Sequence, residues 1–228
     1  MIVSHKHKFI FIKTRKTAGT SIEIGLSKVC GKDDVITPIT RVDEQLRKEF
    51  GGVSPQNYKV PFNRYGSYEF YQMFRHRKRI EFYNHISAAE ARKFLGKKIW
   101  EEYYKFTYDR NPYDKALSLY FYFGGEKKYK DFKSFIQSPD IRYLNSYDAY
   151  TIDGALAVDE LFKFEEIESS LKIVSETLGL DKPIELPGKK AKGGMRKVKD
   201  YKSLFDEESK QKIDVFSARE IKLLNYHY

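Results

Sequence analysis

Short apolar runs alternate along the chain with longer segments in which apolar side chains recur at helical spacing. Residues 9–12 form a β-branched and aromatic run that ends at a polar loop, which predicts a buried strand. Similar or alternating runs predict further strands over residues 80–83, 105–108 and 161–164. Strands that alternate with helices favour an α/β fold, in which helices flank a mostly parallel central sheet.

Capping residues predict where the helices begin and end. Thr20 or Ser21 can cap a helix after the first strand, and Gly31 ends it. Ser87 and Glu90 have the spacing of a capping box, which predicts a helix that begins directly after Ser87. Further helices are expected over residues 42–50, from residue 112 onward, over residues 167–178 and over residues 206–224. Apart from residues 42–50, the proline- and glycine-containing segment 33–79 is expected to be irregular.

The length of 228 residues suits a single domain, residues 1–228, and shows no internal repeat. No segment approaches the ~20 consecutive apolar residues of a membrane span, and the first residues lack the pattern of a secretory signal. Cys30 is the only cysteine, so the chain cannot form an intrachain disulfide or a thiolate metal cluster. We therefore expect a cytoplasmic protein with no membrane span.

The formal net charge of +10 favours anionic partners. Nucleic acid, a phosphorylated small molecule and an acidic acceptor all fit this charge, and solubility alone would also explain it. The basic residues are scattered, and no zinc-finger, helix-turn-helix or RNP signature is present, so we do not expect nucleic acid as the partner.

The loop at residues 13–21 joins the first strand to the first helix and has the features of an anion site. Small residues let the backbone approach a ligand, and the N–H groups and dipole of the helix start favour negative charge. Thr17, Thr20 and Ser21 add hydroxyl donors, and Lys16 adds a cation. A polar, positively charged turn with no ligand is the alternative interpretation.

The same loop is not a Walker A motif. That motif needs a Gly-Lys pair before its last hydroxyl residue, whereas Gly19 is followed here by Thr20. The sequence therefore disfavours nucleoside triphosphate hydrolysis.

The string K-T-A-G-T-S in this loop resembles the 5′-phosphosulfate loop of the sulfotransferases that use 3′-phosphoadenosine 5′-phosphosulfate (PAPS), particularly their carbohydrate branch. The resemblance implies the P-loop-kinase-like sulfotransferase fold. It also implies that Lys16 contacts the bridging oxygen and stabilises the leaving phosphate. The cofactor-binding residues that it implies here are Arg15, Lys16, Thr17, Ala18, Gly19, Thr20 and Ser21. Arg15 stands where many relatives have proline.

A second phosphate motif follows the strand predicted at residues 105–108. Arg110 ends this strand and Ser118 lies eight residues later, so a guanidinium and a hydroxyl can bind one anion if strand end and helix face converge. The segment resembles the family's R-N-P-Y-D-R-x-x-S-x-Y motif, which implies that Arg110 and Ser118 bind the 3′-phosphate. Asp109 departs from the apolar residue usual before the arginine, and we expect it to pair with a local cation.

Transfer to a hydroxyl requires a base, for which His85 is the strongest of the five histidines. His85 precedes a capped helix, and the resemblance implies a general base in this H-[IVL]-[ST] context. A surface or capping histidine is the alternative, and Glu81, Asp33 and Asp34 are reserve candidates for the base. An unperturbed imidazole would give the pH profile an ionisation near ~6 to 7.

A glycine-rich basic segment, residues 186–197, precedes the last helix. Its composition fits a solvated linker as well as a cover for a polyanion. The family has a basic segment near its C-terminus that covers the cofactor, and this resemblance implies a contact from one or more of Lys192, Arg196 and Lys197.

These features together predict a sulfotransferase that moves a sulfuryl group from PAPS to a hydroxyl by in-line displacement, with His85 as base and no metal. The acceptor is expected to be a small molecule or a carbohydrate, bound by segments 33–79 and 121–160, which match no family motif. A P-loop-type kinase of a small molecule and a basic nucleic-acid-binding module are the alternatives.

Overall fold

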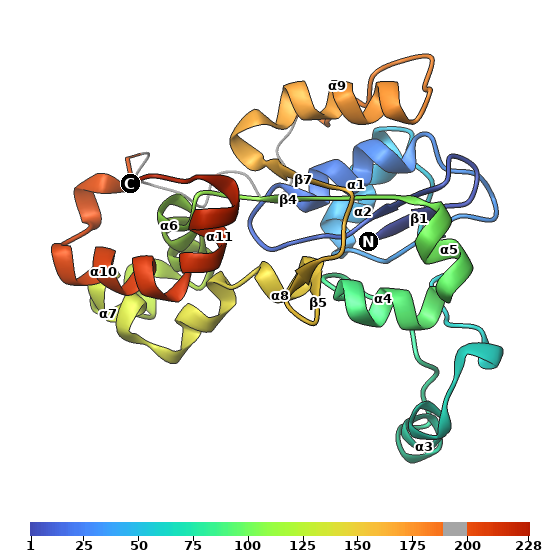
Figure 1. Cartoon of the computed structure of the whole chain (residues 1–228), viewed down its shortest axis with the longest axis horizontal. Helices are drawn as coiled ribbons and strands as arrows, with labels where there is room; N and C mark the ends of the chain where they lie inside the picture. The colour runs from blue at the N-terminus through green and yellow to red at the C-terminus, as the bar shows by residue number, and fades with distance from the viewer. Residues whose placement is uncertain (189–199) are drawn as a thin grey trace.

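A five-stranded sheet forms the centre of the computed structural model, which describes residues 1–188 and 200–228 (Figure 1). In spatial order the strands are β3 (Val35–Ile36), β1 (Ile2–Ser4), β2 (Phe9–Phe11), β4 (Tyr104–Asp109) and β7 (Glu160–Lys163). β2, β4 and β7 are mutually parallel, whereas β1 is antiparallel to both of its neighbours. The sheet is therefore mixed, and the prediction of a mostly parallel sheet was wrong. The four residues between β1 and β2 are too few for a crossover, so this pair has to be antiparallel.

The strand predicted over residues 80–83 is also wrong. This segment is a loop whose one ladder contact is the bridge between Glu81 and Lys59. Phe82 is nevertheless buried, with its ring 6.1 Å from that of Phe94. The apolar pattern therefore predicted the burial of Phe82 correctly, but among the described residues no neighbouring strand pairs with the segment to form a ladder.

Side-chain alternation along the strands divides the core into two layers. Phe9 and Phe11 of β2 face α1 (Gly19–Ser27) and α9 (Ile167–Thr177), where they join Leu26 and Leu171. Ile10 and Ile12 face the opposite side, which α4 (Ala88–Leu95) and α5 (Lys97–Glu102) cover. Helices flanking both faces of the sheet confirm the α/β class.

A third apolar cluster lies beyond the carboxyl ends of the parallel strands, next to the C-terminus (Figure 1). Its elements are α6 (Pro112–Tyr122), α7 (Phe132–Gln137), the 3-10 segment η3 (Pro139–Leu144), α10 (Glu207–Phe216) and α11 (Ala218–Leu224). The single helix expected over residues 206–224 is divided at Ser217, whose φ of −109° and ψ of 23° interrupt the helix.

The remaining elements are short. They are α2 (Arg41–Glu49), α3 (Ser67–His76), α8 (Tyr147–Tyr150), the hairpin β5 (Thr151–Ile152) and β6 (Ala155–Leu156), and the 3-10 segments η1 (Phe62–Arg64), η2 (Gly125–Lys127), η4 (Phe164–Glu166) and η5 (Lys202–Leu204). α2 confirms the helix expected near residues 42–50, whereas the sequence did not predict α3 or β3. α3 lies apart from the other helices at the end of extended links (Figure 1). Within the described residues, no helix has the length and apolar character needed to cross a membrane.

Candidate anion and transfer site

The loop between β2 and α1, predicted from sequence to bind an anion, has an unusual backbone conformation at two of its residues. Lys16 and Ala18 have φ of 63° and 54°, in the left-handed region that residues with a Cβ rarely adopt. Gly19 is the first residue of α1, and a Cβ there would lie 2.7 Å from Cγ of Lys13. Such strained conformations persist only where the surrounding structure holds them, and they cluster at functional sites.

The hydroxyl groups of the loop divide into two sets. Thr17 is buried and its Oγ1 lies 3.0 Å from Oγ1 of Thr14, so it stabilises the loop internally. Thr20 and Ser21 lie in the first turn of α1, and their hydroxyls make no hydrogen bond to any described residue. They therefore remain available to an anion, together with the first N–H groups of the helix.

A buried ion pair lies under this loop. The Lys13 ammonium pairs with the fully buried Glu23 and donates to Oδ1 of Asn84 at 3.1 Å. Burial alone would raise the pKa of Glu23, but the charges of Lys13 and of the Met1 amino group lower it to about 2. The sequence did not predict this pair, although the position of Glu23 between Ile22 and Ile24 was a visible signal of a buried charge.

The second motif meets the first one directly. Arg110 follows β4, and its Nη1 donates to the backbone oxygen of Lys16 at 3.1 Å. Its Nε donates to Asp114 at 2.7 Å, and its guanidinium lies 4.5 Å from the ring centre of Phe164. The structure therefore brings Arg110 and the loop at residues 13–21, which we call the anion loop, together at the shared carboxyl edge of β2 and β4.

Ser118 lies on α6 one turn beyond Asp114, on the helix face that continues from Arg110. The side chain is half-buried, and its hydroxyl makes no hydrogen bond to any described residue. The sequence did not assign Asp114, the carboxylate that holds the Arg110 guanidinium in place.

Asp109 pairs with a local cation, as predicted. Its Oδ1 lies 2.8 Å from the Lys115 ammonium, and both side chains are almost fully buried. Its Oδ2 accepts a hydrogen bond from Tyr150 at 3.0 Å. This network ties α6 and α8 to the end of β4 and thereby fixes the start of the helix that carries Ser118.

His85 contacts the opposite side of the anion loop. Its backbone is also left-handed, with φ of 63°, and its Nδ1 donates to the backbone oxygen of Lys13 at 3.0 Å. A carbonyl can only accept, so this bond leaves the Nε2 lone pair free to take a proton. Burial, together with the charges of Lys13 and Arg15, lowers the pKa of His85 to about 4. The imidazole is therefore neutral at pH 7, and its ionisation moves below the range expected from sequence.

Aromatic rings flank the two remaining cations of the loop. The Lys16 ammonium lies 4.4 Å from the ring centre of Tyr122, and the exposed Arg15 guanidinium lies 5.2 Å from that of Tyr143. Both rings belong to the segment expected to bind the acceptor. The sequence did not predict these two cation–ring contacts.

The other predicted residues are separate from this edge. Asp34 accepts backbone hydrogen bonds from His5 and Lys6, at 2.7 and 3.1 Å, and so stabilises the turn between β1 and β2. Lys192, Arg196 and Lys197 lie outside the described residues.

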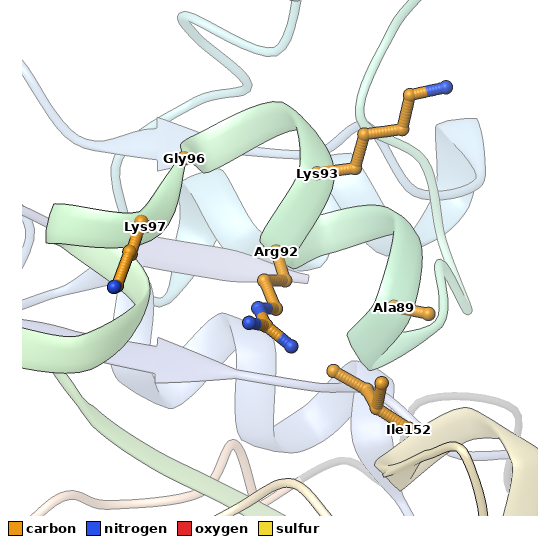
Figure 2. A pocket seen from close by; sticks show the side chains of 6 residues that line it. All are labelled: Ala89, Arg92, Lys93, Gly96, Lys97 and Ile152. Carbon is orange, nitrogen blue, oxygen red and sulfur yellow. The ribbon is translucent and has the colours of Figure 1, made fainter.

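An open depression of about 340 Å³ lies elsewhere, at the corner between α4 and α5. Its lining residues are Ala89, Arg92, Lys93, Gly96, Lys97 and Ile152, none of which is a predicted site residue. Figure 2 shows Arg92 extending toward Ile152, whereas Lys93 points away from both. The depression is therefore distinct from the edge where the motifs meet.

No protein-family model matches the chain, and no solved structure matches it. A curated protein of Archaeoglobus fulgidus, described as uncharacterized, is 27% identical over 106 residues, which are 44% of this chain and 88% of that protein. These comparisons name no activity.

Proposed function

We propose that this chain is a sulfotransferase that moves a sulfuryl group from PAPS to a hydroxyl of a small-molecule or carbohydrate acceptor. The observation that carries the proposal is the hydrogen bond from Arg110 to the Lys16 carbonyl. It joins the two motifs that resemble the 5′ and 3′ phosphate sites, although they lie 94 residues apart. Parallel strands with an anion loop at the carboxyl end of β2 also support the P-loop-kinase-like sulfotransferase fold.

Each residue has a separate role in the proposed binding mode. The loop amides, Thr20 and Ser21 bind the 5′-phosphosulfate, while Arg110 and Ser118 bind the 3′-phosphate. Lys16 stabilises the charge that develops on the leaving phosphate. Its contact with Tyr122 places its ammonium beside the aromatic segment, where the acceptor would bind.

His85 serves as the base of an in-line displacement. Its Nδ1 bond to Lys13 fixes the ring and leaves Nε2 to take the hydroxyl proton as the acceptor oxygen bonds to sulfur. The bond from sulfur to the bridging oxygen breaks, and 3′-phosphoadenosine 5′-phosphate leaves with that electron pair. Negative charge from the donor offsets the cations beside His85, so we expect its pKa to rise when the nucleotide binds.

Ligand binding to two variants tests the nucleotide site. Arg110→Ala should weaken binding of 3′-phosphoadenosine 5′-phosphate by ~2 kcal/mol or more, and Ser118→Ala by about 1 kcal/mol, both measured by calorimetry. The Ser118 hydroxyl makes no bond to a described residue, so this variant tests ligand contact without disturbing the fold. Neither variant should weaken adenosine 5′-phosphosulfate comparably, because it lacks the 3′-phosphate. Equal losses for both ligands would contradict the assigned 3′ site.

A donor assay tests the reaction itself. The protein should transfer label from PAPS to some member of a panel of hydroxyl acceptors. Transfer from ATP with magnesium, and none from PAPS, would replace the proposal with the kinase alternative.

A further inference from the structure

Residues 62–79, which we call the α3 arm, carry several aromatic side chains that are exposed to solvent. Tyr68, Tyr71 and Phe74 are 65%, 56% and 73% exposed, and their spacing of three residues places them on one helix face. The opposite face carries Glu69, which is buried and pairs with Lys93 of α4. The arm is thus anchored to the body on one face and presents a stripe of rings on the other.

The same arm carries a concentrated positive charge. Residues 62–79 contain five Lys and Arg side chains against a single carboxylate. Arg75, Arg77 and Lys78 are exposed and form no ion pair with any described residue. The cations therefore lie at the end of the aromatic stripe with no counter-charge from the described part of the chain.

The exposed rings and the unpaired cations of the arm together indicate what kind of partner it binds. A ten-residue helix with so few contacts is marginal in water, so a partner that covers its rings would stabilise it. A second copy would bring an arm of the same positive sign against it, which disfavours pairing of two arms. Phenol and phenyl rings beside a cluster of Lys and Arg fit the interface of an anionic membrane, where the rings insert among headgroups and the cations meet lipid charge.

We propose that the α3 arm docks the protein onto an anionic lipid surface. Tyr68, Tyr71 and Phe74 insert at the headgroup level, and Arg75, Arg77 and Lys78 bind the charged headgroups. Docking through the arm needs no membrane span. It does not rest on the reaction proposed above, and it assigns residues 62–79, part of the segment expected to bind the acceptor, to a lipid surface instead.

Vesicle co-sedimentation of the whole chain tests this proposal. Vesicles that contain about one third phosphatidylserine should bind the protein at least ~100-fold more tightly than pure phosphatidylcholine, since each of three cations contributes about fivefold. Raising the salt from about 0.1 M to about 0.5 M should remove most of this difference.

Two variants and their matched controls locate the contact. Arg75→Gln/Arg77→Gln/Lys78→Gln should abolish the preference for anionic vesicles, whereas Lys127→Gln/Lys130→Gln/Lys222→Gln, with the same change in net charge, should retain it within about threefold. Tyr71→Ser/Phe74→Ser should weaken binding to anionic vesicles by at least ~10-fold, and Val215→Ser/Leu223→Ser should not. The control side chains are all exposed, which matches them to the arm.

Three outcomes would overturn the proposal. They are equal binding to neutral and anionic vesicles, equal losses in the arm and control variants, and a dimer in light scattering that Tyr71→Ser/Phe74→Ser dissociates. The last outcome would assign the arm to a second copy of the chain.

Discussion

The carboxyl edge of β2 and β4 and the α3 arm are both rich in cations and rings, but they use them differently. At the edge, Lys13, Arg110 and Lys115 each pair with a carboxylate inside the protein. In the arm, Arg75, Arg77 and Lys78 pair with no described residue. Clustered positive charge therefore has two structural roles in this protein. Cations that pair with carboxylates inside the protein hold a site in place. Cations that are exposed and pair with no described residue form a surface that can bind a partner.

The largest effect should come from breaking the ion pair under the anion loop. Glu23→Gln leaves the Lys13 ammonium buried without its carboxylate, so we expect a loss of about 3–5 kcal/mol in the free energy of unfolding. Chemical denaturation followed by circular dichroism measures it. Glu185→Gln is the matched control, because Glu185 forms an exposed pair with Lys28 at 3.6 Å and should contribute less than ~1 kcal/mol. If both variants lost a similar free energy of unfolding, the buried ion pair would contribute no more to stability than the exposed one.

A smaller effect, on turnover, should distinguish two histidines. His85→Ala should lower turnover by ~100-fold, or about 2.7 kcal/mol in activation free energy, with little change in nucleotide affinity. His7→Ala removes an imidazole of the turn between β1 and β2, at the other end of β2 from the loop at residues 13–21, and should leave turnover unchanged. A His85→Ala variant with near-normal turnover would end its proposed role as base, and Glu81 would be examined next.

The pH dependence of stability gives His85 a second readout. Its pKa is about 4 in the folded chain, against about 6.5 when unfolded, so the unfolded state binds more protons between these values. The stabilising contribution of neutral His85 is complete above pH ~6.5 and is lost as the pH falls toward 4. His85→Ala should flatten this part of the stability profile, and NMR titration of the ring should show its pKa rising with bound 3′-phosphoadenosine 5′-phosphate.

Local signals in the sequence predicted much of this edge. Ser87 caps α4 by accepting from the backbone of Glu90, and Pro112 begins α6, both as their positions predicted. The loop at residues 13–21 does connect a buried strand to a helix. These features depend on neighbouring residues, so the local sequence contains the information that determines them.

Features that depend on distant partners were not predictable in the same way. The mixed sheet depends on how the short β1 and β3 pair, and strands of two or three residues leave almost no periodic pattern. The bond from Arg110 to Lys16 and the pairing of Lys13 with Glu23 appear only when strands and helices pack. The sequence therefore identified the residues of the candidate site but not the internal partners that hold them.

The smallest expected effect concerns the stability of the arm. Tyr71→Ser/Phe74→Ser removes two rings that are already exposed, so the free energy of unfolding should change by no more than ~0.5 kcal/mol in the absence of lipid. Phe82→Ser is the contrasting control, since this buried ring packs beside Phe94 and its loss should destabilise the fold by about 3 kcal/mol or more. Thermal unfolding of the two variants measures both changes under one condition. If the arm variant lost as much stability as Phe82→Ser, the exposed rings would be part of the core, and the contrast between an internally paired edge and an exposed arm would fail.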